Sequence, residues 1–330
     1  MSEYLLEVKD LKKVFPIYSP ILKRAIGGVR AVENVSFNLS AGETIGIVGE
    51  SGCGKTTLGR VITHIYSPTD GRMLFDGKDV VGLGGAALKE HRKNVQMIFQ
   101  DPYSSLNPKM RVNEMIAEPL WVNNLMSKKE AFERVPELLE IVGLRATDAQ
   151  KFPHQFSGGQ RQRVGIARAI AMNPRLIVAD EAVSALDVSI QAQILNLMMD
   201  LKKRLGLSYI FISHNLAVIK FVSDKVCVMY LGRVVEMAPK NRLFTNTLHP
   251  YTKALLSAAP VADRQHQKNR IIMQGDIPNP ANPPSGCVFH ERCSECFDLC
   301  RTTVPPTVEF EDNHIVACHL YTSREYNHGS

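Results

Sequence analysis

A glycine-rich segment in the first sixth of the chain carries residue types that bind phosphate. Residues 49–56 read Gly-Glu-Ser-Gly-Cys-Gly-Lys-Thr. Glycines let backbone N–H groups turn inward around phosphate oxygens, while Lys55 would reach the β- and γ-phosphates and Thr56 would ligate Mg²⁺. A glycine-rich structural turn is the alternative. The predicted nucleotide-binding residues are Gly49, Ser51, Gly52, Gly54, Lys55, Thr56 and Thr57.

Two adjacent carboxylates follow a short apolar run further along the chain. Residues 175–179, Arg-Leu-Ile-Val-Ala, indicate a central parallel strand that ends in Asp180 and Glu181. A carboxylate at such a strand end can hold the hydrated Mg²⁺ of a bound nucleotide, which is the role we expect for Asp180. Glu181 is the candidate general base, because an attacking water needs a proton acceptor within hydrogen-bond reach. An acidic helix N-cap is the alternative interpretation.

A second anion-binding pattern is the run Ser157-Gly158-Gly159-Gln160. Serine is a favoured N-cap residue, and the apolar residues that follow it have helical spacing. Two glycines ahead of a helix expose backbone N–H groups to an anion. The sequence therefore predicts two helix N-termini that are suited to phosphate.

Strands and helices must position these residues, and the apolar spacing predicts where they lie. Strands are expected at 43–48, 175–179 and 208–212, and a hairpin around 226–236 should turn at Leu231-Gly232. One helix should begin near Lys55 and include Ile65, and another should follow Asp187 and end before Gly206. The segment 90–165 is mostly helical in pattern, and 16–30 is expected to be a surface loop, with a short membrane-surface segment as the alternative.

Taken in order, these motifs resemble the ATP-binding-cassette (ABC) family over roughly residues 5–250. The resemblance implies an α/β fold with a P-loop NTPase (RecA-like) core of the ABC type, an antiparallel β part and a helical subdomain at about 101–167. Its further motifs are an adenine-stacking Phe15, the Q-loop Gln100, the signature Ser157 to Gln160, the D-loop ending in Asp187, and the switch histidine His214.

The resemblance also implies roles for these residues. Catalysis would fall to Glu181, His214, Gln100 and Lys55, and Gln100 would join Thr56 and Asp180 at Mg²⁺. Family members pair two cassettes head to tail, so that the signature of one cassette closes over the ATP held by the other. This chain has no internal repeat, and the second cassette must therefore come from another chain.

The last eighty residues are similar to those of ATPase subunits from bacterial dipeptide and oligopeptide importers, a group with nickel-type relatives. The similarity lies in 249–256, 275–278 and 282–287. It implies an ATPase that works with a second homologous ATPase subunit, two transmembrane permeases and an extracytoplasmic substrate-binding protein. The sequence does not separate peptide, nickel or another small solute as the cargo. We expect a nucleotide-binding domain at 1–250 and a small cysteine-rich extension at 251–330.

Five of the seven cysteines lie in the last 45 residues. Disulfides are disfavoured in a cytosolic ATPase, so dense cysteines indicate metal binding. The importer resemblance favours a [4Fe–4S] cluster at Cys287, Cys293, Cys300 and Cys318. Zn²⁺ with His290 and His319 nearby, or no metal, are the alternatives, and Cys296 departs from the pattern as a further possible ligand.

Composition limits the remaining interpretations. The chain has 330 residues, a formal net charge of +6, no apolar run of eighteen residues and no signal-peptide pattern near Met1. These features, with the resemblance, predict a peripheral protein on the cytoplasmic face of the inner membrane, with no nucleic-acid partner. Two other function classes remain as alternatives: a soluble cassette ATPase acting on nucleic acid or ribosomes, and a redox-sensing regulatory module in which ATP is structural.

Overall fold

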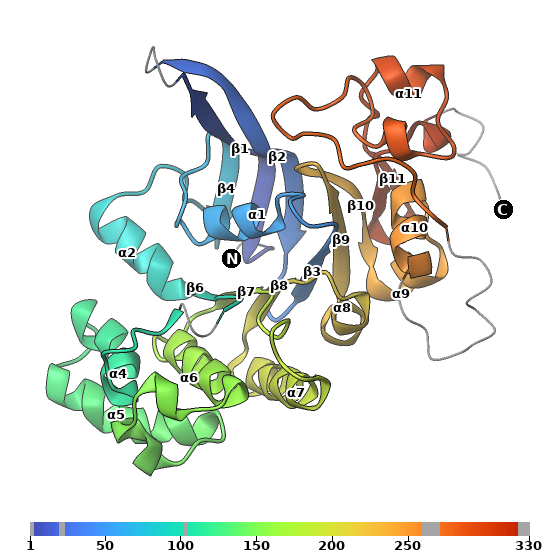
Figure 1. Cartoon of the computed structure of the whole chain (residues 1–330). Helices are drawn as coiled ribbons and strands as arrows, with labels where there is room; N and C mark the ends of the chain where they lie inside the picture. The colour runs from blue at the N-terminus through green and yellow to red at the C-terminus, as the bar shows by residue number, and fades with distance from the viewer. Residues whose placement is uncertain (1–2, 20–23, 102–104, 259–270, 323–330) are drawn as a thin grey trace.

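A computed structural model of the chain describes residues 3–19, 24–101, 105–258 and 271–322. The strands form two sheets with different roles. The larger sheet has eight strands in the order β11-β12-β10-β9-β3-β8-β7-β6, and the smaller has four in the order β2-β1-β4-β5. The helices gather in a group below the large sheet and in a smaller group beside its C-terminal edge (Figure 1).

The centre of the large sheet is parallel and buried. Five strands run parallel, and four of them are β3 (Thr44–Val48), β6 (Val95–Ile98), β7 (Leu176–Asp180) and β8 (Ser208–Ile212). β9 (Lys225–Tyr230) also runs parallel to β3, and β10 (Arg233–Pro239) then turns back against β9. All residues of β3, β7 and β8 are buried, as expected for strands covered on both faces.

The parallel arrangement has a consequence for function. Because parallel strands point the same way, their carboxyl ends meet along one edge of the sheet, where ligands bind in such folds. The phosphate loop follows β3, Gln100 follows β6, Asp180 ends β7 and His214 follows β8. The topology therefore brings four separate sequence motifs to one edge.

The smaller sheet is antiparallel and contains the first part of the chain. It consists of β1 (Leu6–Tyr18), β2 (Ala25–Leu39), β4 (Asp70–Phe75) and the two-residue β5 (Lys78–Asp79). The surface loop predicted at 16–30 is wrong for its described residues, because β1 and β2 continue as a paired hairpin, with Pro16 opposite Gly28 and Tyr18 opposite Ala25. Residues 20–23 lie outside the described part of the chain.

Helices of the first two-thirds of the chain cover the sheets. α1 (Lys55–Ile62) lies between the two sheets, and α2 (Gly85–Asn94) precedes β6. The segment predicted as helical contains α4 (Val112–Val122), α5 (Lys128–Ile141), the short 3₁₀ turns η1 (Ala146–Gln150) and η2 (Pro153–Gln155), and α6 (Gly158–Ile170). These helices form the green group at the lower left of Figure 1, whereas β6 within the same segment was not predicted.

The predicted boundaries of two helices have different outcomes. α7 (Val188–Leu205) ends where the sequence predicts, because Gly206 adopts the left-handed conformation that closes a helix, with φ 66°. The prediction that Ile65 belongs to the helix beginning at Lys55 is wrong: α1 ends at Ile62, and His64 turns the chain with φ 54°. Ile65 is 45% exposed.

The C-terminal part packs against the far edge of the large sheet. Its elements are α9 (Lys240–Thr245), α10 (Pro250–Ala258), η4 (His290–Arg292), α11 (Asp298–Thr302), β11 (Val308–Phe310), η5 (Glu311–Asn313), β12 (His314–Val316) and η6 (His319–Tyr321), whereas α8 (Leu216–Val222) packs against the central strand β3. β12 pairs with β10, and β11 pairs with β12. The end of the chain thus extends the central sheet and shares its core.

A fully buried carboxylate fixes this junction. Glu236 on β10 accepts hydrogen bonds from the backbone N–H groups of Leu248 and His249, at 2.8 and 3.0 Å, and contacts His314 Nε2 of β12 at 2.8 Å. These partners come from two C-terminal segments, the residues just before α10 and strand β12. Since a buried carboxylate is stable only when its oxygens are satisfied, Glu236 specifies how these segments meet.

Candidate nucleotide site

The phosphate loop joins β3 to α1 and depends on glycine at two places. Gly49 has φ 152°, and a Cβ there would lie 2.2 Å from the carbonyl oxygen of Met229. Gly54, the N-cap of α1, has φ 102°, and its Cβ would lie 2.0 Å from the carbonyl oxygen of Ala31. Both positions combine positive φ with close backbone contact, so no other residue fits without moving the loop.

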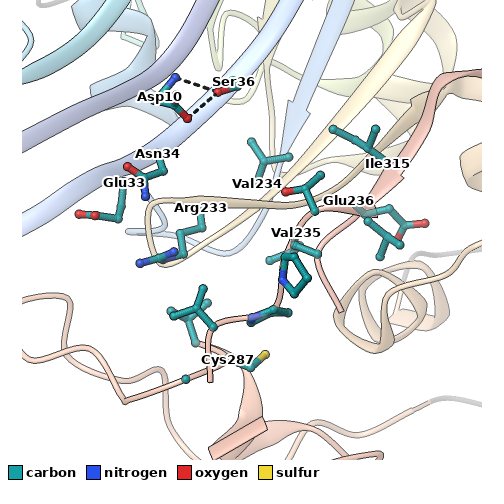
Figure 2. Close-up of a pocket in the computed structure, with 18 residues that line it drawn as sticks. Asp10, Glu33, Asn34, Ser36, Arg233, Val234, Val235, Glu236, Cys287 and Ile315 are labelled. Carbon is teal, nitrogen blue, oxygen red and sulfur yellow. Dashed lines mark hydrogen bonds between the residues drawn. The ribbon is translucent and has the colours of Figure 1, made fainter. Parts of the chain in front are cut away.

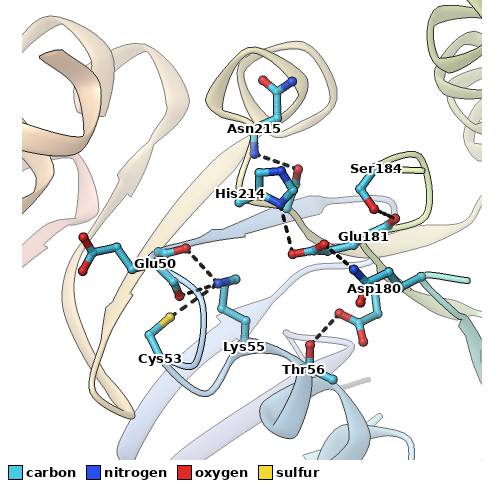
Figure 3. Close-up of polar contacts among 12 residues, drawn as sticks. Glu50, Cys53, Lys55, Thr56, Asp180, Glu181, Ser184, His214 and Asn215 are labelled. Atoms are coloured by element: carbon cyan, nitrogen blue, oxygen red, sulfur yellow. Dashed lines mark hydrogen bonds and ion pairs between the residues drawn. The ribbon is translucent and has the colours of Figure 1, made fainter. Parts of the chain in front are cut away.

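Lys55 is buried at the centre of this loop. Its ammonium donates hydrogen bonds of 2.8 Å to the carbonyl oxygens of Gly49 and Glu50, and lies 3.6 Å from Cys53 Sγ (Figure 3). Burial raises the pKa of the Cys53 thiol, and the neighbouring Lys55 opposes that shift. The ammonium is therefore oriented by the loop's own carbonyl oxygens. It lies at the N-terminus of α1, where the helix dipole also stabilises an anion.

A hydroxyl and a carboxylate face each other across the start of α1. Thr56 Oγ1 donates a 2.9 Å hydrogen bond to Asp180 Oδ1. Asp180 is 2% exposed, and burial raises its pKa, although the Thr56 bond opposes the rise. A hydroxyl and a carboxylate are oxygen ligands of the type that Mg²⁺ accepts, so this pair fits the metal side of a nucleotide site.

Three side chains from three strand ends converge on one another. Glu181 Oε1 lies 3.1 Å from His214 Nδ1, and Glu181 Oε2 accepts a 2.8 Å hydrogen bond from Gln100 Nε2. The Glu181 backbone has φ 46°, which is uncommon outside glycine, and its N–H donates to the Ile212 carbonyl at 2.9 Å. The strand edge thus holds a carboxylate with an imidazole and an amide each within hydrogen-bond reach of it.

A cavity of about 690 Å³ connects these groups. It is lined by Phe15, Val29, Ala31, Ser51, Gly52, Gly54, Lys55, Thr56, Thr57, Gln100, Glu181, His214 and Pro280. Phe15 presents its ring at one end and packs edge-to-face on Tyr66, with centroids 5.3 Å apart. The predicted adenine-stacking residue therefore shares a cavity with the predicted phosphate-binding residues.

The signature residues lie elsewhere. Ser157 caps α6, with the Gln160 N–H donating to Ser157 Oγ and the Ser157 N–H donating to Gln160 Oε1, at 3.4 and 3.0 Å. Neither residue lines the cavity, and both side chains are exposed. Asp187, the N-cap of α7, is also exposed and outside the cavity. Ser157, Gln160 and Asp187 are thus exposed and lie outside the chain's own cavity, whereas Gly159 is buried at the start of α6.

Sequence reasoning missed three residues of the C-terminal part that reach the site. Pro280 lines the cavity, Arg292 forms an ion pair with Glu50 of the phosphate loop, and the Tyr251 hydroxyl accepts a hydrogen bond from the Glu50 N–H. No local pattern links these residues to a loop about 200 residues earlier.

The cysteines of the C-terminal part lie near one another. Cys287, Cys300 and Cys318 are buried, Cys293 is partly buried, and all are free thiols. Burial raises the pKa of Cys293 to about 12 and that of Cys318 to about 11, and in both cases Cys287 and Cys300 are close enough to add to the rise.

Among the described residues no three His, Cys, Asp or Glu side chains converge as ligands of a metal ion, so the structure supports neither the predicted iron–sulfur cluster nor the zinc alternative. His290 and His319 instead contact backbone carbonyls of Cys287 and Thr303, at 2.9 and 2.8 Å. The Cys296 thiol lies 3.8 Å from the Phe297 carbonyl oxygen, and it is close enough to Cys287 to add to the raised pKa of that thiol.

A second cavity, of about 450 Å³, lies between the small sheet, β10 and the C-terminal part (Figure 2). Asp10 and Ser36 share hydrogen bonds on one wall, and Cys287 lies on another. None of the phosphate-loop residues lines it. This cavity is therefore separate from the candidate nucleotide site.

Comparison with known protein families supports the same interpretation of both parts of the chain. The ABC transporter family matches residues 32–184, and the family described as the C-terminal region of oligopeptide/dipeptide transporters matches residues 235–300. The first match contains the phosphate loop, Asp180 and Glu181, and the second contains Cys287, Cys293 and Cys300.

Similar proteins cover nearly the whole chain. The oligopeptide transport ATP-binding protein AppF of Bacillus subtilis (strain 168) is 51% identical over 324 residues, covering 97% of this chain and 98% of that protein. The di/tripeptide transport ATP-binding protein DppF of Pseudomonas aeruginosa (strain UCBPP-PA14) is 48% identical over 317 residues, covering 96% and 98%.

Solved structures share the fold of the nucleotide-binding part. cbiO1 from Clostridium perfringens, part of the ABC transporter complex cbiONQ, has a TM-score of 0.64 at 28% identity and covers 74% of this chain and 92% of its own. The ATP-binding cassette MJ0796, a dimer in a post-hydrolysis state bound to ADP and Pi, has a TM-score of 0.63 at 29% identity. The match covers 71% of this chain and 98% of the MJ0796 chain.

Proposed function

This chain belongs to the ABC transporter family of ATP-binding subunits, and we propose that it powers the uptake of di- or oligopeptides across a bacterial inner membrane. As a member of that family it is an ATPase that converts ATP and water to ADP and phosphate. The observation that carries the proposal is the shared cavity of the phosphate loop, Glu181 and His214, combined with a C-terminal region of the oligopeptide/dipeptide transporter type. The same engine for nickel or another small solute is the second candidate.

The position of each catalytic residue supports one chemical role. Lys55 would bind the β- and γ-phosphates, and Thr56, Gln100 and Asp180 would hold Mg²⁺, which would supply positive charge to the phosphate oxygens. Glu181 takes a proton from the attacking water, while Gln100 and His214 hold its carboxylate in place. Gly49, Ser51, Gly52, Gly54 and Thr57 complete the phosphate cradle, and Phe15 stacks on the base.

The outward signature supports a second proposal, head-to-tail pairing with a homologous ATPase subunit. Ser157, Gly158, Gly159 and Gln160 begin α6 outside the chain's own cavity, so this helix N-terminus could meet the ATP of a partner, and Gly158 lies near Leu186, the residue before Asp187. The pair would drive two transmembrane permeases that receive solute from an extracytoplasmic binding protein. No helix in the described ranges is long and apolar enough to cross a membrane, which is compatible with a peripheral place on the cytoplasmic face.

We further propose that residues 1–250 form the nucleotide-binding unit and that 251–330 form an extension with an iron–sulfur centre. Cys287, Cys293, Cys300 and Cys318 supply four neighbouring thiols, as a [4Fe–4S] cluster requires. Bound iron would favour the thiolate form of these side chains.

The function is tested by capturing the assembly in its ATP-bound state. Tagged Glu181→Gln protein, purified from membranes with ATP and Mg²⁺, should turn over ATP about 100-fold or more slowly, because the general base is lost. It should therefore retain a related ATPase and two permeases, identified by mass spectrometry. The identity of the permeases and of the co-purified binding protein would narrow the cargo.

A matched double variant distinguishes pairing with the second ATPase subunit from binding of ATP. Glu181→Gln combined with Ser157→Ala should still bind ATP, since Ser157 lies outside the chain's own cavity, but should lose the related ATPase on purification. Recovery of ribosomal or DNA-repair proteins without membrane proteins would overturn the importer proposal. Unchanged ATP turnover in the assembled Glu181→Gln complex would refute the general-base assignment.

A further inference from the structure

One residue of the phosphate loop is held mainly by the C-terminal part of the chain. Glu50 lies between the first two glycines of the loop. Its backbone N–H donates a 2.8 Å hydrogen bond to the Tyr251 hydroxyl, and its carboxylate pairs with Arg292. In Figure 3 the Glu50 side chain is directed away from Lys55, whereas its carbonyl oxygen faces the Lys55 ammonium.

The Arg292–Glu50 pair has the geometry of a strong ion pair. Arg292 Nη1 and Nη2 donate to the two Glu50 carboxylate oxygens at 2.6 and 3.0 Å. The two side chains are only 7% and 19% exposed, so solvent screens the pair weakly. The Glu50 bond, the first of several causes, raises the pKa of Arg292, which stays charged. Arg292 Nη1 also lies 3.3 Å from the Tyr230 hydroxyl.

A short chain of contacts connects this pair to the phosphate-binding lysine. Arg292 bonds the Glu50 carboxylate, and the Glu50 carbonyl oxygen accepts from Lys55 Nζ at 2.8 Å. The residue after Arg292 is Cys293, so the cysteine segment itself supplies the guanidinium. Pro280 adds an independent contact, since it lines the nucleotide cavity and its carbonyl accepts the Arg30 N–H at 3.4 Å.

We propose that Arg292 is a positioning residue of the ATP site, through which the cysteine-bearing extension sets the affinity of the phosphate loop for nucleotide. Loss of the guanidinium frees the Glu50 carboxylate, and the Glu50 carbonyl no longer holds Lys55 in one orientation. Coupling between two parts of a protein is typically worth a five- to 150-fold change in affinity. The extension thus contributes to nucleotide binding. This role is separate from permease coupling and from metal binding.

The test measures ATP affinity directly in the purified full-length chain. Arg292→Met and Glu50→Gln should each raise the dissociation constant of a fluorescent ATP analogue by about fivefold or more. Because both substitutions remove the same pair, the double variant should be no weaker than the weaker single variant. Arg292→Lys keeps the charge but not the two-pronged geometry, and should restore part of the affinity.

Arg175→Met is the matched control. Arg175 also forms a two-pronged pair, with Asp76 at 2.8 and 3.4 Å, but neither residue lines the nucleotide cavity. The Arg175→Met protein should bind the fluorescent ATP analogue with the same affinity as the parent protein. Thermal unfolding of every variant identifies any that fail to fold. If Arg292→Met fails to fold, Glu50→Gln still tests the proposal, because glutamine has nearly the shape of glutamate and keeps the loop unchanged.

The proposal is overturned by either of two results. One is that Arg292→Met and Glu50→Gln bind the analogue within twofold of the parent while remaining folded. The other is that their losses add fully in the double variant, because additivity would mean that the two residues act independently.

Discussion

At the residue scale, the phosphate loop depends on the space around its backbone as much as on the charge of its side chains. Lys55 and Thr56 are the chemical groups, but Gly49 decides whether the loop can close around them. Its φ of 152° and the Met229 carbonyl 2.2 Å from its Cβ position leave no room for a side chain. Sequence predicts the glycine as part of a motif, and the structure gives the physical reason.

Gly49→Ala should therefore abolish ATP binding, with a loss of about 100-fold or more in affinity, because strain of a few kcal/mol must be relieved by moving the loop. Gly42→Ala is the control, since Gly42 has a similarly positive φ of 74° but nothing within 4 Å of its Cβ position. That variant should lose about 1–2 kcal/mol of stability and keep its affinity for ATP. Equal ATP affinity in the two variants, measured by equilibrium binding, would contradict the argument.

At the scale of elements, a buried histidine makes the start of α10 sensitive to acid. His249 is 1% exposed, its Nδ1 accepts the Tyr251 N–H at 3.0 Å, and its own backbone N–H donates to Glu236. Burial lowers the pKa of His249 to about 4, outweighing the opposite effect of Glu236. The folded protein thus holds a neutral imidazole where the unfolded chain would bind a proton below pH 6.5.

This shift predicts the sign of a pH effect on stability. The folded-state pKa is below the unfolded value, so the unfolded chain takes up the proton first as pH falls, and stability decreases between about pH 6.5 and 4. The contribution of His249 is on the order of 3 kcal/mol. His249→Asn keeps an acceptor for the Tyr251 N–H and does not titrate, so its stability should fall less steeply. Parallel slopes from urea unfolding of parent and variant over this range would refute the assignment.

At the scale of the whole molecule, the C-terminal part completes both the sheet and the nucleotide site. β12 pairs with β10, Glu236 joins three segments, and Arg292 reaches Glu50. The four clustered cysteines lie in this same part, against the main core. The molecule therefore combines its ATP chemistry and its thiol chemistry in one packed unit.

Iron content tests the thiol chemistry. Protein purified without oxygen should contain about four iron atoms per chain and absorb visible light. Cys300→Ser should lose most of the iron, because Cys300 is buried beside Cys287 and Cys318. Cys296→Ser should retain it, since that thiol is directed at the Phe297 carbonyl. Stoichiometric zinc without visible absorption, or equal iron loss in both variants, would exclude the proposed cluster.

Much of the fold and of the candidate site follows from the sequence because the signals are local. Continuous apolar runs predict β3, β7 and β8, and Gly206 marks the end of α7. Leu231-Gly232 correctly predicts the turn between β9 and β10, where both residues have positive φ. The prediction of a loop at 16–30 was wrong because it considered the segment by itself, whereas pairing between β1 and β2 keeps its described residues extended.

The sequence by itself determined which residue types are available: a phosphate loop, a carboxylate pair, a signature and a set of clustered cysteines. Only the tertiary structure decided which of them meet. Parallel strands bring Gln100, Glu181 and His214 together at one edge, and the same packing turns Ser157 away from them. The Arg292–Glu50 pair joins positions 242 residues apart, and no local pattern encodes such a contact because it depends on how the whole sheet is assembled.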